Sequence, residues 1–308
     1  MTQLHSHDLA RPGATIRYWS GGPDNAATVV FLHGATLDHR AWHPQTDALR
    51  RRFRVVAPDL RGHGSSTGRF DFDTAVQDVL ALLDHLPGPP VVLVGLSLGA
   101  NIAQEVIRRR PDLVGGLVAA DTTCNTADRH PLAATTTIAA LRVQALWAGN
   151  EFARQAARAT ATDPQVQNYV LEVNAHRSNE ETIDILTCLL TNALQPDPSY
   201  RLPVPALLVH GQLDHIGDIA TDMRGWAHRE PLARYAVIPD AGHASNLDNP
   251  AVFTNLLVEF IDLGSTGPSG TIASTTSSVA PTGAARRTAR RIVSHSSSGQ
   301  SCSTSIRT

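Results

Sequence analysis

The chain has 308 residues, of which 42% are hydrophobic and 18% charged, and its formal net charge at pH 7 is -2. This length accommodates one large domain or two small ones. Because the net charge is close to zero, the main body of the chain is not expected to bind polyanions such as nucleic acid. All 26 residues counted as lysine or arginine are arginine. Without lysine, the chain cannot perform Schiff-base, P-loop or Ser-Lys dyad chemistry.

The three cysteines are far apart in the sequence and form neither a paired framework nor a C-x-x-C motif; they are Cys124, Cys188 and Cys302. This spacing argues against a disulfide scaffold and against a structural zinc site, and it fits a reducing compartment. Residues 1–14 lack the positive and apolar segments of a signal peptide, and no stretch of the sequence approaches the length of a membrane span. We therefore expect a cytoplasmic protein without a membrane anchor.

Six short apolar runs predict strands that are buried on both faces of a sheet, because they are too short for helices and show no alternation. They are residues 29–32, 54–57, 91–94, 116–119, 206–209 and 235–238. Apolar residues recur at helical spacing in three segments: after Asp71, before Pro111, and after Asn249-Pro250. The pair Asn249-Pro250 can cap and open a helix. Alternating strands and helices predict an α/β fold with a mostly parallel central sheet and helices on both faces.

The alternation stops between residues 125 and 195, where apolar residues recur at helical intervals and strand signals are absent. This pattern predicts a helical insertion that caps the strand ends, so residues 1–124 and 196–263 form the core. Residues 264–308 are rich in Ser, Thr, Gly, Ala and Pro, and contain five arginines and no acidic residue. Such a segment predicts a disordered tail. We interpret the tail as a solvated extension rather than a nucleic-acid or membrane contact.

The candidate nucleophile is Ser97. The sequence Gly95-Leu96-Ser97-Leu98-Gly99 follows the strand at 91–94 and opens a helix, which is the context that a G-x-S-x-G nucleophile elbow requires. The two glycines let strand and helix approach closely while the serine Oγ projects from the sheet edge. The Leu98 amide, at the start of the helix, then points to where a tetrahedral oxyanion forms.

A second oxyanion donor is expected from the loop after an earlier strand. His33-Gly34-Ala35 follows the strand at 29–32, so the Ala35 amide is the candidate. Gly34 permits the turn, and His33 is interpreted as structural.

The general base must reach Ser97, and an acid must hold that base in the right tautomer. His243 is the candidate base, because Asp240-Ala241-Gly242-His243 lies on the loop between the last strand and the terminal helix. Asp214 is the candidate acid, because it follows the strand at 206–209 through a short loop. Asp121, at the end of the strand at 116–119, and Asp218 are alternatives that the sequence leaves open.

Five motifs in this order resemble the α/β-hydrolase superfamily: His33-Gly34, Pro58 to Ser65, Gly95 to Gly99, Gly211 to Asp214, and Gly242-His243. More narrowly, they resemble the branch that contains esterases, 3-oxoadipate enol-lactonases, cofactor-free perhydrolases and C–C bond hydrolases. The resemblance spans about Gly13 to Leu263. It implies a triad of Ser97, Asp214 and His243, an oxyanion hole of the Ala35 and Leu98 amides, and a pocket beneath the cap.

Two features depart from the family pattern. The family commonly has a proline a few residues after its acid, whereas Asp214 is followed by His215-Ile216-Gly217-Asp218. In the enol-lactonase cap a basic residue often precedes a tryptophan, whereas Leu146 precedes Trp147 here. The resemblance therefore does not establish an enol-lactone as the substrate.

Together these residues predict a serine hydrolase that cleaves a carboxylic ester or lactone through an acyl-enzyme, without a cofactor. Its partner is expected to be a small to medium, partly apolar substrate. The pocket for this substrate is expected to be lined in the cap by Leu141, Leu146, Trp147 and Phe152. The same triad can also serve C–C bond hydrolysis, perhydrolysis or a lyase reaction, and a ligand receptor could retain the pocket. Histidine pairs with metal-like spacing lack accompanying carboxylates or cysteines, so no metal is implied; they are His39 with His43 and His210 with His215.

Overall fold

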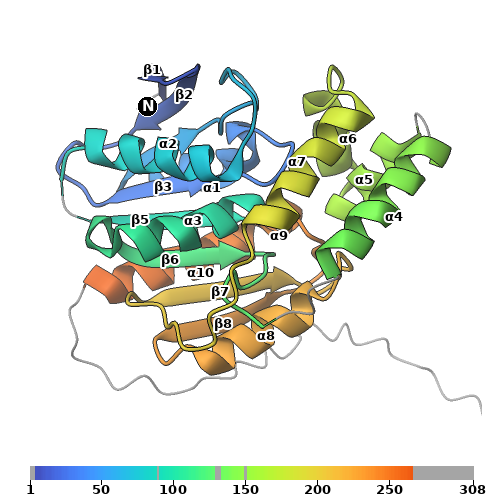
Figure 1. Ribbon diagram of the computed structural model, residues 1–308. Helices are drawn as coiled ribbons and strands as arrows, with labels where there is room; N and C mark the ends of the chain where they lie inside the picture. Colours follow the sequence, from blue (N-terminus) through green and yellow to red (C-terminus); the bar gives the residue numbers. More distant parts are fainter. Residues whose placement is uncertain (1–3, 89, 129–132, 149–150, 266–308) are drawn as a thin grey trace, which may run out of the picture. The chain divides into compact units, whose positions relative to one another are not determined.

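The computed structural model describes residues 4–88, 90–128, 133–148 and 151–265. It contains an eight-stranded sheet with the strand order β1-β2-β4-β3-β5-β6-β7-β8 (Figure 1). Neighbouring strands from β4 to β8 are parallel, whereas β2 pairs antiparallel with both β1 and β4. The predicted mostly parallel sheet is therefore confirmed.

All six predicted strands are present. They are β3 (Thr28–Leu32), β4 (Arg54–Pro58), β5 (Val91–Leu96), β6 (Val114–Ala120), β7 (Ala206–Gly211) and β8 (Ala233–Ile238). Every residue of β3 and of β7 is buried, as expected for central strands. β8 differs from the prediction, because most of its residues are half-buried and Val237 is 41% exposed. The reason is its position at the end of the sheet, where helices cover it less completely.

Two N-terminal strands were not predicted: β1 (His5–Arg11) and β2 (Ala14–Gly21). In β2, buried Ile16 and Tyr18 alternate with half-buried residues, which is the pattern of a strand with one buried face. Pro12-Gly13 connects the two strands, and φ of 68° at Gly13 suits a tight turn with proline before glycine. The alternation and the turn signal are both local in the sequence, so together they could have predicted this hairpin.

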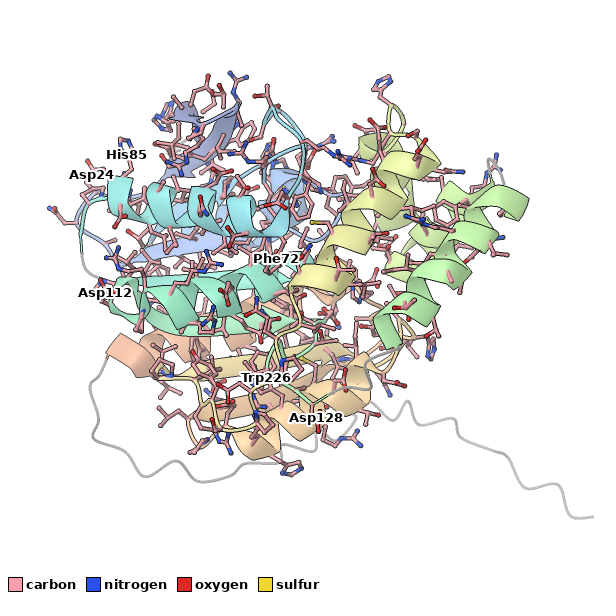
Figure 2. All side chains as sticks on the ribbon, in the orientation of Figure 1. Asp24, Phe72, His85, Asp112, Asp128 and Trp226 are labelled. Carbon is pink, nitrogen blue, oxygen red and sulfur yellow. The ribbon has the colours of Figure 1, made fainter. Side chains whose placement is uncertain are left out.

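Helices cover both faces of the sheet, so the predicted fold class is confirmed. One face carries α2 (Phe72–His85), α3 (Leu98–Arg109) and α8 (Ile219–Arg229), and their apolar side chains form one cluster that includes Phe72 and Trp226 (Figure 2). The other face carries α1 (His43–Leu49) and α10 (Pro250–Ser265), with Trp42 and Phe253 in a second cluster. Alternate residues of each central strand enter opposite clusters, and this packing fixes the strand ends in space.

Local hydrogen bonds explain where several of these helices begin. Asp71 Oδ1 accepts the Thr74 N–H at 2.9 Å ahead of α2, and Asn249 Oδ1 accepts the Val252 N–H at 3.4 Å ahead of α10. Both caps satisfy N–H groups that have no partner inside the helix. Two short helices, η1 (His39–Trp42) and α9 (Ser245–Asp248), follow the loops after β3 and β8.

Four helices lie between β6 and β7: α4 (Ala133–Ala148), α5 (Glu151–Thr160), α6 (Pro164–Val173) and α7 (Asn179–Asn192). We call residues 133–148 and 151–192 the helical insertion. Tyr169 donates to Asp38 after β3, Arg177 donates to the Gly62 carbonyl after β4, and the Thr160 carbonyl accepts the Ala244 N–H after β8. The insertion therefore contacts the loops at the carboxyl ends of three strands. Its role as a cap over a substrate stays a prediction.

The C-terminal helix α10 continues to Ser265, two residues beyond the predicted core boundary. The rest of the predicted tail, residues 266–308, lies outside the described residues. Within the part of the chain that the structure describes, no helix is both long enough and apolar enough to cross a membrane.

Candidate active site

Ser97 forms the turn between β5 and α3. Its backbone angles are φ 50° and ψ -115°, a conformation that costs a non-glycine residue on the order of 1–3 kcal/mol. A Cβ on Gly95 would lie 2.4 Å from the Ala100 nitrogen, and a Cβ on Gly99 would lie 2.1 Å from the Leu32 carbonyl oxygen. Because any side chain there would collide with backbone, the turn requires glycine on both sides of Ser97. The predicted strand-turn-helix context is confirmed.

The two predicted oxyanion donors lie on neighbouring loops. Ala35 follows β3 and Leu98 opens α3, and the sheet pairs Leu32 at the end of β3 with Gly95 of β5. Among the described residues, neither the Ala35 nor the Leu98 amide donates a hydrogen bond to a protein acceptor. The Leu98 amide also lies at a helix N-terminus, where the helix dipole favours negative charge. Both amides can therefore donate hydrogen bonds to an anionic oxygen. Their role as an oxyanion hole stays a prediction.

Asp214 and His243 form a hydrogen-bonded pair. His243 Nδ1 lies 2.9 Å from Asp214 Oδ2, and the two side chains are 10% and 0% exposed. Asp214 Oδ1 accepts the Ile216 N–H at 2.9 Å, so both carboxylate oxygens have partners. Asp218, one of the alternative acids, is exposed immediately before α8. The contact between Asp214 and His243 favours a proton on Nδ1 and leaves Nε2 as the nitrogen that can accept one.

The environment of His243 predicts the pH dependence of activity. Burial lowers the pKa of His243, but the hydrogen bond to Asp214 and the charges of Asp214 and Asp121 together outweigh burial, so the pKa lies above the ordinary 6.5. A general base works only when it is deprotonated, so we expect kcat/KM to fall on the acid side with a midpoint above pH 6.5. Asp214→Asn removes the two largest causes that raise this pKa, so its midpoint should be lower and its rate lower by about 10⁴-fold.

The pH–rate profiles of the wild type, Asp214→Asn and Asp218→Asn check this expectation. Asp218→Asn is the matched control, because it neutralises an exposed carboxylate four residues away and should leave the midpoint unchanged. A wild-type midpoint below pH 6.5, or a profile that is flat on the acid side, contradicts His243 as the base.

Asp121, the other alternative acid, is fully buried directly after β6. Its Oδ1 accepts the Gly211 N–H at 2.7 Å, and its Oδ2 is hydrogen-bonded to the Ser245 hydroxyl. Burial raises the pKa of Asp121 to about 8 against the opposing effect of the His243 charge. The hydrogen bonds of Asp121 therefore go to two loops, while His243 is paired with Asp214.

Other histidines of the predicted motifs have structural partners. His33 Nδ1 donates to the Gly34 carbonyl at 2.8 Å, and His33 Nε2 accepts the Leu60 N–H at 2.9 Å, so this buried ring joins the loops after β3 and β4. Burial lowers the pKa of His33, which favours the neutral ring that these two bonds require. His210 contacts the Tyr235 hydroxyl at 2.6 Å. Within the described residues, no group of three or more His, Cys, Asp or Glu could hold a metal ion.

The predicted pocket residues belong to α4 and α5. Leu141 is half-buried on α4. Phe152 is 4% exposed and packs with Ala145 and Ile183 inside the helical insertion, which accounts for its burial without a ligand. The side chains of Leu146 and Trp147 lie outside the described residues. The lining of the pocket stays a prediction.

Two side chains next to the site were not predicted. Thr122 Oγ1 lies 3.1 Å from the Ser97 carbonyl oxygen, so it contacts the backbone of the nucleophile turn. Tyr169 Oη donates to Asp38 Oδ1 at 3.0 Å and links α6 to the loop that carries Ala35. Neither residue belongs to a local motif, and Tyr169 is 131 positions away from Asp38 in the sequence. No spacing signal could have identified this contact.

Comparison with known proteins relates this geometry to a family. Residues 29–256 match the model of the alpha/beta hydrolase family. The 3-oxoadipate enol-lactonase 1 of Acinetobacter baylyi is 36% identical over 33% of this chain and 40% of its own length, so the match spans less than half of that relative. The 2-(acetamidomethylene)succinate hydrolase of Mesorhizobium japonicum is 26% identical over 83% of this chain and 94% of its length. The enol-lactonase structure from Burkholderia xenovorans LB400 gives a TM-score of 0.71 at 25% identity, covering 83% of this chain and 100% of that one.

Proposed function

Because the chain belongs to the alpha/beta hydrolase family, we propose that it is a serine hydrolase that cleaves a carboxylic ester or lactone through an acyl-enzyme. Ser97 is the proposed nucleophile, His243 the general base and Asp214 the acid. The Ala35 and Leu98 amides form the proposed oxyanion hole. The observation that carries the proposal is the combination of the strained Ser97 turn with the 2.9 Å hydrogen bond between His243 and Asp214.

In the proposed reaction, His243 Nε2 takes the proton of Ser97 as Oγ attacks the carbonyl carbon. The two amides stabilise the tetrahedral oxyanion, and loss of one donor is expected to cost about 3 kcal/mol. Collapse of the intermediate breaks the ester bond, and the leaving alcohol takes its proton from His243. Water then attacks the acyl-enzyme while His243 removes its proton, which releases the carboxylic acid and restores Ser97.

The proposed substrate is a small to medium, partly apolar ester or lactone. Two observations support this class: relatives and solved structures are named as enol-lactonases, and the predicted lining on α4 and α5 is apolar. C–C bond hydrolysis, perhydrolysis and lyase reactions can use the same triad. Substrate tests therefore have to separate these reactions.

The testing experiment is an activity panel of short-chain nitrophenyl esters, lactones and vinylogous diketones, run beside labelling with a fluorophosphonate probe. We expect turnover of an ester or lactone and a covalent adduct on Ser97, located by peptide mass spectrometry. Turnover of diketones alone assigns C–C bond hydrolysis, and activity that requires hydrogen peroxide assigns perhydrolysis. Ligand binding with neither turnover nor adduct identifies a receptor and overturns the proposal.

A further inference from the structure

Asp121 lies between the strands that lead to the proposed catalytic residues. It follows β6, and β6 lies between β5, which leads to Ser97, and β7, which leads to Asp214. The Asp121 N–H donates to the Val209 carbonyl at 2.9 Å. Its φ of 46° falls in the left-handed region, which a non-glycine residue occupies at an energetic cost. Asp121 is therefore held in a strained conformation beside the proposed site.

The carboxyl group of Asp121 joins two loops, which we call the acid loop (residues 211–214) and the base loop (residues 240–245). Oδ1 accepts the N–H of Gly211, three residues before Asp214, and Oδ2 shares a hydrogen bond with the hydroxyl of Ser245, two residues after His243. The two loops also touch directly, because the Leu213 N–H donates to the Ala241 carbonyl at 2.8 Å. One buried side chain thus ties both loops to the end of β6.

We propose that Asp121 is a positioning residue that sets the geometry of the Asp214–His243 pair. The inference rests on the proposed function, and Asp121 itself touches no reacting atom. It acts by holding the base loop against the acid loop, so that His243 Nδ1 stays within hydrogen-bonding distance of Asp214 Oδ2. A misplacement of about 1 Å between catalytic groups can reduce a rate by about a hundredfold. The effect should therefore appear in kcat rather than in KM.

The charge of Asp121 agrees with this role. Because burial raises its pKa to about 8, Asp121 is largely protonated at neutral pH, and only its ionised form carries the negative charge that helps to raise the pKa of His243. In that form Oδ2 can donate its proton to Ser245 Oγ and Oδ1 can still accept the Gly211 N–H. The titratable groups that act on Asp121 are His243 and Asp214. An asparagine at this position can keep the two shorter contacts, with its oxygen toward the Gly211 N–H and its amide toward Ser245 Oγ, and it loses only the 3.4 Å contact from the Ser245 N–H.

The first part of the test compares Asp121→Ala and Asp121→Asn with the matched control Asp218→Asn. We expect Asp121→Ala to lower kcat roughly tenfold to a hundredfold with little change in KM. Asp121→Asn should recover most of the rate, and Asp218→Asn should behave as the wild type. Thermal unfolding verifies that each variant is folded. An unchanged kcat in folded Asp121→Ala overturns the proposal.

Ser245→Ala keeps the proposal testable if Asp121→Ala does not fold. This variant removes the hydroxyl contact between Asp121 and the base loop and keeps the weaker one, in which the Ser245 N–H donates to Asp121 Oδ2 at 3.4 Å. It should therefore lower kcat in the same direction by a smaller factor. If Asp121→Ala does not fold and Ser245→Ala turns over substrate at the wild-type rate, the proposal is overturned.

A second readout needs no substrate. Histidine titration by NMR, with the His243 signal identified by its absence in His243→Gln, measures the pKa of His243 directly. We expect Asp121→Ala and Ser245→Ala to bring this pKa down toward 6.5, while Asp218→Asn leaves it unchanged. Asp121→Asn removes only the charge of Asp121, which also raises this pKa, so its decrease should be smaller than that of Asp121→Ala. If the wild type neither turns over a substrate nor reacts with the probe, the proposed function fails, but a lowered pKa still supports the positioning role. An unchanged pKa in the folded alanine variants overturns that role whatever the activity.

Discussion

Replacement of Ser97 by alanine is expected to reduce turnover by about 10⁶-fold and to abolish covalent labelling by a fluorophosphonate probe. Without Oγ, no acyl-enzyme can form, and the remaining oxyanion donors give only the residual catalysis of a site that lacks its nucleophile. The fold should survive, because alanine removes a hydroxyl group and retains the backbone. Steady-state kinetics on the best substrate of the panel and intact-protein mass spectrometry after labelling measure the two effects.

Ser6→Ala is the matched control, because Ser6 is an exposed serine on the outermost strand β1. It loses the same hydroxyl group and should keep wild-type turnover and wild-type labelling. Circular dichroism and the urea midpoint should be the same for both variants within error. A folded Ser97→Ala protein with more than about 1% of wild-type turnover would show that another group is the nucleophile, since the expected loss is several orders of magnitude larger.

The nucleophile turn could be predicted because its requirements are local in the sequence. A strand, two glycines around a serine and a helix start all lie within residues 91–100. A Cβ at Gly95 or Gly99 would collide with backbone atoms, which explains why only glycine fits at these two positions. The central strands could be predicted for a similar reason, because complete burial produces continuous apolar runs. Local signals therefore identified six of the eight strands and the candidate serine.

The choice among three acids could not be made from the sequence. Asp214, Asp218 and Asp121 all follow strands or open helices, and only the folded chain pairs one of them with His243. The contact between Asp121 and Ser245 joins residues 124 positions apart, so no local pattern records it. The exposure of β8 is likewise set by its place in the sheet rather than by its own residues. Contacts and exposure of this kind depend on which strands are neighbours in the sheet, and that order is not recorded in any local stretch of sequence.

Gly99→Ala is expected to destabilise the protein by about 3 kcal/mol or more, at the upper end of the cost of overpacking. The added Cβ would lie 2.1 Å from the Leu32 carbonyl oxygen and 2.7 Å from the His33 carbonyl oxygen. Both are backbone atoms, so no change of side-chain rotamer can relieve the collision. Either α3 or the end of β3 has to move. These segments carry Ser97 and lead to Ala35, so turnover should fall together with stability.

Gly225→Ala is the matched control for this change. Gly225 lies inside α8, and a Cβ added there would have no atom within 4 Å apart from its chain neighbours and the backbone of its own helix. Alanine should stabilise this helix by about 0.5–1 kcal/mol, because glycine loses more conformational freedom on folding. Both variants exchange glycine for alanine in a helix, so the difference between their free energies of unfolding isolates the contact between α3 and β3. Urea unfolding at 25 °C measures it. A Gly99→Ala midpoint equal to that of Gly225→Ala would contradict the close approach on which the strained Ser97 turn depends.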